Sequence, residues 1–206
     1  MRKWHSRLAQ EIVEDNFPGN EQVDLFLNIE IDNEYRKLIG IIARSHGMGI
    51  TDLNSSLKMF DEDALEYPRE VPIYYLMAIL RLADYFDAGN DRAPHAIMAM
   101  QRFESEISYD EFKWNQTVNL GNDWGVEKYE RVFVNIKLDN IDSKTFLKVE
   151  GWLKGIQREL DECWRQISLH YKDKYQFSIR RIDSNMFQSV TRKNIKNQNF
   201  SFHQVI

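Results

Sequence analysis

Cysteine and long apolar runs are scarce in this sequence, and each shortage excludes a class of protein. The single cysteine, Cys163, excludes an internal disulfide and a cysteine-based zinc site, and it fits a reducing compartment. The most apolar run, residues 73–80, is much shorter than the roughly 20 residues that span a bilayer. No apolar stretch follows the positively charged N-terminus, so a secretory signal is not expected. We therefore expect a soluble, cytoplasmic protein that does not enter a membrane.

The composition is that of a globular protein. Hydrophobic residues make up 43% and charged residues 29% of the 206 positions, which is enough apolar material for a core. The formal net charge of −5 argues against a protein dedicated to nucleic acids or membrane surfaces. A local basic bias near the C-terminus keeps nucleic-acid binding as a third, less favoured alternative. Its candidate residues are Arg180, Arg181, Arg192, Lys193 and Lys196.

The first half of the chain has the periodicity of helices. Apolar residues recur at helical spacing, and glycine, proline and asparagine separate the periodic segments. We expect a first helix that includes His5, Leu8, Ile12 and Val13 and ends before residue 16, and further helices around residues 33–46, 73–87 and 94–103.

The second half mixes strands and helices. Residues 131–138 alternate sides and are rich in β-branched residues, which predicts a strand, with residues 113–120 as its hairpin partner. Residues 177–182 are predicted to form a short strand, and residues 146–170 a long amphipathic helix. The predicted inward residues of this helix are Phe146, Val149, Leu153, Ile156, Leu160 and Ile167. The predicted fold is mostly α: a helical domain over residues 1–108, followed by a small α+β extension over residues 109–206.

A polar stripe runs along the helix expected at residues 73–87. Its charged residues, Arg81, Asp84 and Asp87, fall within an arc of roughly 120°, while the rest is apolar nearly all round and predicts an interior helix. Buried carboxylates are costly unless they are paired or bind a cation. Either Arg81 pairs with Asp84 in a structural role and Asp87 caps the next loop, or the stripe is a functional site.

Histidines near two other helix termini add to the second interpretation. Arg44 and His46 end the helix over residues 33–46, where a histidine can cap the helix or, with Arg44, face a phosphate. His5 lies on the first helix, beside Arg7. Each histidine alone is more commonly structural, but His5, His46 and Asp84 on three different helices indicate a shared site.

In this order, these residues resemble the HD superfamily. Within it, the chain is similar to the HD domains found beside GHKL-type, chaperone-like ATPases in bacterial conflict systems. The run Leu80–Arg81–Leu82–Ala83–Asp84, followed by Asp87 and by Arg92–Ala93–Pro94, carries most of the resemblance. Trp114, the strand near Val132 and residues 182–185 are similar to the α+β extension of such proteins.

The resemblance implies metal-dependent hydrolysis of phosphoesters or phosphoanhydrides. It implies that Asp84 is a metal ligand, and that His46 and Arg44 act in catalysis by steadying the phosphate. It implies substrate contacts for four residues: His5, Arg81, Asp87 and Arg92. The implied cofactor is a divalent metal (Mg, Mn, Fe, Ni or Zn) if the site is completed, and otherwise none.

One departure from the superfamily is serious. None of the five histidines is followed by aspartate, so the His-Asp dipeptide that holds the metals is missing. We expect that the chain begins after the segment that carries the dipeptide. The missing ligands then belong to another polypeptide, or the chain is a fragment, or the fold has lost its chemistry; these alternatives stay open.

Two functions remain in competition. The favoured hypothesis is a non-catalytic or partial HD-like module within a larger assembly, with an ATPase of a defence system as the implied partner. The alternative is a metal-dependent phosphohydrolase acting on nucleotides, whose missing ligands come from a protein partner or an upstream segment.

Overall fold

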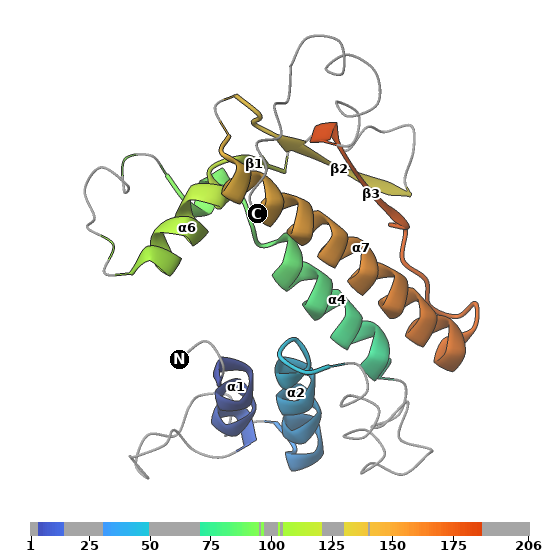
Figure 1. The fold of residues 1–206 in the computed structure, drawn as a ribbon. Helices are drawn as coiled ribbons and strands as arrows, with labels where there is room; N and C mark the ends of the chain where they lie inside the picture. Colours follow the sequence, from blue (N-terminus) through green and yellow to red (C-terminus); the bar gives the residue numbers. More distant parts are fainter. Residues whose placement is uncertain are drawn as a thin grey trace, which may run out of the picture. The chain divides into compact units, whose positions relative to one another are not determined.

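The fold is mostly helical and carries one small sheet, as the sequence predicts (Figure 1). The structure is a computed structural model that describes residues 4–14, 31–49, 71–94, 96, 103, 105–120, 130–139 and 141–186. Along the chain the elements are α1 (His5–Glu14), α2 (Asn33–Ser45), α4 (Ile73–Phe86), η3 (Asn90–Arg92), α6 (Glu106–Asn115), β1 (Val118–Asn119), β2 (Arg131–Ile136), α7 (Ser143–Tyr171) and β3 (Arg181–Ser184). No helix in these ranges is long and apolar enough to cross a membrane.

The chain divides into two compact units. The first unit comprises Met1–Asp87 and Arg158–Phe177, and the second unit comprises Ala88–Gln157 and Ser178–Ile206. Helix α7 therefore contributes its C-terminal part to the first unit and its N-terminal part to the second. These units are compact bodies rather than sequence domains, so the predicted boundary near residue 108 stays a prediction.

In the first unit, helix α4 packs through one side only. Its buried residues are Ile73, Tyr74, Met77, Ala78, Arg81 and Leu82. The ring of Tyr74 stacks on His170 of α7, with 3.9 Å between ring centroids and 5° between planes. The backbone N–H of Tyr74 also donates to the hydroxyl of Tyr171 over 3.2 Å. Burial raises the pKa of Tyr74 and lowers the pKa of His170.

In the second unit, the sheet has the order β1-β2-β3. Strand β1 pairs antiparallel with β2, with Val118 opposite Ile136, whereas β2 and β3 are parallel, with Val132 opposite Ile182. Parallel neighbours need a long crossover, and α7 lies in that crossover between β2 and β3. Along β2 the even-numbered residues are buried and the odd-numbered residues are exposed.

Helix α7 confirms the predicted amphipathic pattern. Five of the six predicted inward residues are at most 1% exposed: Val149, Leu153, Ile156, Leu160 and Ile167. The sixth, Phe146, is only half-buried near the start of the helix. Cys163 is buried beside them, as expected for a packing residue, and burial raises the pKa of its thiol to about 12. Asp142 caps the helix by accepting a 2.9 Å hydrogen bond from the N–H of Thr145, and it also pairs with Lys113. These contacts, led by the one with Lys113, lower the pKa of Asp142.

Two strand predictions were wrong in their bounds. The strand predicted at residues 113–120 is limited to Val118–Asn119, because residues 113–115 belong to the end of helix α6. Ser105 caps the start of this helix by accepting a hydrogen bond from the N–H of Ser108, and the buried Trp114 anchors its end. Strand β3 begins at Arg181 and not at Phe177, since its pairing starts where Arg180 and Arg181 donate to the carbonyl of Glu130. The helix expected at residues 94–103 lies almost wholly outside the described residues.

Candidate functional site

Two of the predicted site residues meet in the first unit. His5 is the first residue of α1, and His46 follows the last residue of α2. Their Nε2 atoms are 2.7 Å apart, and their ring centroids are 4.7 Å apart at 45°. One ring donates the proton and the other accepts it, with roles set by the tautomers. We call these two residues the histidine pair.

Two glycines on α2 and its C-terminal turn explain how close the two helices approach. A β-carbon at Gly47 would lie 2.6 Å from the β-carbon of Ser6 and closer still to its hydroxyl. One at Gly40, seven residues earlier, would lie 2.8 Å from a carboxylate oxygen of Glu14. Real β-carbons do not approach neighbours so closely. Because Ser6 follows His5 and Gly47 follows His46, glycine at position 47 permits the contact between the histidines.

Arg44 lies between the same two helices. Its Nη1 donates to Oε1 of Gln10 over 2.9 Å, and Nε2 of Gln10 donates to Glu14 over 2.7 Å. The guanidinium therefore links α2 to α1. The Nδ1 atom of His46 is buried and has no hydrogen-bond partner within the described ranges.

Arg81 is a structural centre of the first unit. It is only 8% exposed and forms an ion pair with Glu159 of α7. It also donates to the carbonyl of Ser45 and, over 2.7 Å, to the carbonyl of Met48. Arg81 thus ties α4 and α7 to the turn that carries His46. In the described part of the chain, these contacts stand in place of the expected ion pair with Asp84.

Asp84 corrects the prediction of a buried carboxylate. It is exposed, as is Asp87, and the described residues offer Asp84 no ion pair or hydrogen bond. The expectation of an interior helix was wrong because α4 leaves Leu76 and Ile79 exposed. Asp84 lies on the side of buried Met77, seven residues earlier, but it is exposed because it is near the C-terminal end of the helix. Arg92 is exposed in η3 and belongs to the second unit.

An exposed apolar side of α4 escaped the sequence reasoning. Leu76 is 36% exposed and Ile79 is 43% exposed, and Ala83 is exposed one turn further along. Their spacing of three and four residues places them on one side of the helix. Because α4 is apolar nearly all round, its sequence does not tell which apolar side is covered.

The fit to a divalent metal is partial. Within the described ranges, no group of three or more His, Cys, Asp or Glu side chains could hold a metal ion, so neither Asp84 nor another carboxylate joins the histidine pair in such a group. The pair itself offers two convergent nitrogens. A tetrahedral metal holds nitrogens at about 2.0–2.1 Å, hence roughly 3.3 Å from each other. The rings would have to separate only slightly from their present 2.7 Å.

Comparison with known proteins gives one match. The model of the HD-CE family matches residues 1–162, which is well over half of the chain. A search of the curated proteins and a search of the solved structures found no match. The HD-like domain predicted from the motif residues is thereby confirmed, while the association with a GHKL-type ATPase stays a prediction. The chain belongs to the HD-CE family.

Proposed function

We propose that this HD-CE chain is a partial HD-like module that acts within a larger assembly. The observation that carries the proposal is the exposed apolar side of α4, with Leu76 and Ile79 at 36% and 43% exposure. Neighbouring exposed apolar residues on one side of a helix are typical of a docking surface for another protein. The same helix uses its opposite side, through Arg81, to hold the first unit together.

The partner that the resemblance implies is a GHKL-type ATPase, on the same polypeptide or on a separate one. An apolar segment of that partner would cover Leu76, Ile79 and Ala83. Asp84 of this helix and Asp87, which follows its last residue, are both exposed. They would lie at the rim of the contact and favour a basic neighbour.

The test measures binding between the purified chain and the purified ATPase by calorimetry. Ile79→Lys should weaken binding at least tenfold, because a buried ammonium without a partner opposes association. Leu169→Lys is the matched control: Leu169 is 63% exposed on α7, and its replacement should leave the affinity unchanged. Asp84→Asn should also bind. A complex that tolerates Ile79→Lys, or no complex at all, contradicts the proposal.

The histidine pair supports a second candidate, a metal-dependent phosphohydrolase completed by ligands from another segment. His5 and His46 would hold the metal through their Nε2 atoms, with Asp84 as a further ligand in the completed site. A bound divalent metal would supply an activated water and a counter-charge for the phosphate. Arg44, two residues before His46, would bind phosphate only after leaving Gln10.

This candidate is tested on the complete assembly. Metal content is measured after dialysis against zinc, manganese or nickel, and phosphate release is measured with a panel of nucleotides. His46→Gln should lose metal and hydrolysis together, whereas His170→Gln, which removes a histidine stacked on Tyr74, should keep both. If the assembly binds no metal and hydrolyses no nucleotide, the phosphohydrolase candidate is wrong.

A further inference from the structure

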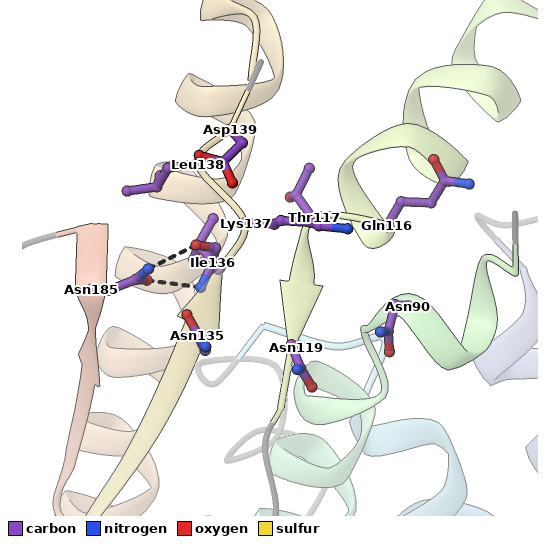
Figure 2. Close-up of a pocket in the computed structure, with 10 residues that line it drawn as sticks. All are labelled: Asn90, Gln116, Thr117, Asn119, Asn135, Ile136, Lys137, Leu138, Asp139 and Asn185. Atoms are coloured by element: carbon purple, nitrogen blue, oxygen red, sulfur yellow. Dashed lines mark hydrogen bonds between the residues drawn. The ribbon is translucent and has the colours of Figure 1, made fainter.

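A polar cavity of about 540 Å³ lies in the second unit, beside the ends of β1 and β2 (Figure 2). This volume is within the range of about 300–1,000 Å³ that is usual for small-molecule sites. Carboxamides dominate its wall. Four amide residues, Asn90, Gln116, Asn119 and Asn135, and two charged residues, Lys137 and Asp139, line it.

The sheet brings two of the amides together. Asn119 of β1 lies directly opposite Asn135 of β2 in the antiparallel register. Side chains of such a pair point to the same side, with β-carbons about 4.5–5.5 Å apart. Both asparagines are exposed, while Val118 and Ile136 beside them are buried. The strand pairing thus presents two neighbouring amides to the cavity.

A third amide comes from the turn after α4. Gly89 has a φ of 155°, a conformation that other residues rarely adopt, and its N–H donates to Oδ1 of Asn115 over 3.0 Å. This fixed turn places Asn90 in the wall of the cavity (Figure 2).

Most of these amides make no side-chain hydrogen bond to the described residues of the protein. Asn185 also lines the cavity, but its amide is bound to the backbone of Ile136 (Figure 2). Its Oδ1 accepts from the N–H of Ile136 over 2.8 Å, and its Nδ2 donates to the carbonyl of Ile136 over 2.7 Å. By contrast, the side chains of Asn90, Asn119 and Asn135 have no hydrogen-bond partner within the described part of the chain. The Nε2 atom of Gln116 is buried and likewise has no partner there. Polar groups that line a cavity and have no protein partner are typical of a site that a ligand completes.

The charge and shape of the wall select the kind of ligand. Lys137 and Asp139 carry opposite charges, so the wall gives no net attraction to an anion such as phosphate. The described residues of the wall include no aromatic ring on which a base could stack. Primary amides offer donors and an acceptor together, as hydroxyl groups do. We propose that the cavity binds a neutral ring with vicinal hydroxyls: a sugar, either free or as the ribose of a nucleoside.

The test is calorimetric titration of the whole chain with D-glucose, D-ribose, adenosine and 2′,3′-dideoxyadenosine. Ligands with vicinal hydroxyls should bind saturably, and dideoxyadenosine should not. Binding of a free sugar identifies that source, whereas binding of adenosine alone identifies a nucleoside. The proposal is overturned if none of the probes binds at concentrations up to about 10 mM, where even millimolar affinity is detected. It is also overturned if 2′,3′-dideoxyadenosine binds as tightly as adenosine.

Variants locate the binding. Asn119→Ala combined with Asn135→Ala should weaken binding at least tenfold, and Asn90→Ala, outside the sheet, should weaken it as well. Asn33→Ala, at an exposed asparagine of α2 in the first unit, is the matched control and should bind normally. Thermal melting confirms that each variant is folded. Unchanged affinity in both the double variant and Asn90→Ala overturns the assignment of the cavity.

Discussion

Replacing Arg81 with methionine should destabilise the chain by about 3–5 kcal/mol, the usual cost of breaking a buried ion pair by removing one partner. Methionine fills much of the same space but carries no charge and no N–H group. Glu159, whose side chain is only 12% exposed, would be left without its cation. The carbonyls of Ser45 and Met48 would also lose a donor.

Urea denaturation followed by circular dichroism measures this loss. With an unfolding slope of about 1–3 kcal/mol per molar urea, the midpoint should fall by roughly 1–5 M. The double variant Arg81→Met/Glu159→Leu should recover part of the loss, because it removes both charges and leaves only the two carbonyls unpaired. A structural role predicts this recovery, whereas a role for Arg81 in substrate binding alone does not.

The matched control is Arg165→Met. Arg165 also pairs with a glutamate on α7, but its side chain is 53% exposed and its partner Glu162 is 30% exposed. Exposed ion pairs contribute little, so this variant should unfold close to the wild-type midpoint. If Arg81→Met loses no more stability than Arg165→Met, then Arg81 does not hold the first unit together and the reasoning is refuted.

Three further predictions concern other positions. Gly47→Ala should lower the free energy of unfolding by about 1–3 kcal/mol, because the added methyl group would overlap Ser6. In the control Gly151→Ala the methyl group meets nothing within 4 Å, so this variant should be neutral or stabilising. Equal effects of the two substitutions in urea denaturation would refute the steric account. Burial lowers the pKa of His170, so as the pH falls the unfolded chain binds a proton at this histidine before the folded chain does. The stability that the neutral histidine contributes should be full above about pH 6.5 and be lost as the pH falls through the lower folded pKa. The variant His170→Gln should flatten this part of the stability–pH curve. Asp142→Ala should lower the urea midpoint, because it removes the side chain that caps α7. Asp142→Asn keeps a capping oxygen and should have a midpoint close to that of the wild type. Equal midpoints for the wild type and Asp142→Ala would contradict the capping role.

The sequence predicts α7 well because the helix is long and its apolar positions keep one period. Every predicted inward position from Val149 to Ile167 is buried. The parallel order of β2 and β3 was not predictable, since alternation gives a strand but not its neighbour. The bounds predicted for β1 were wrong because they rested on the turn residues that follow it, Gly121, Asn122 and Gly125. The cap at Ser105 and the buried ring of Trp114, which mark helix α6, are weaker signals in the sequence.

The candidate site was predictable in its residues but not in its geometry. His5, Arg44 and His46 stand out because they lie near helix ends. The contact between the two histidines depends on Gly47, whose effect appears only when α1 and α2 pack together. On α4 the charges alone do not tell which turns inward. Arg81 does so because its partner comes from a distant helix, which no local pattern reveals. Asparagines next to turns and strand ends were the available signal for the amide cavity.

The ion pair of Arg81 also constrains the order in which the protein matures during its synthesis. Glu159 follows Arg81 by 78 positions in the chain. At a translation rate of about 5–20 residues per second, Arg81 waits roughly 4–16 seconds on the ribosome for that carboxylate. All of residues 88–157, which belong to the second unit, are made in the interval. The ion pair that ties α4 to α7 therefore forms only after most of the second unit has been synthesised, although α4 itself is made before that unit.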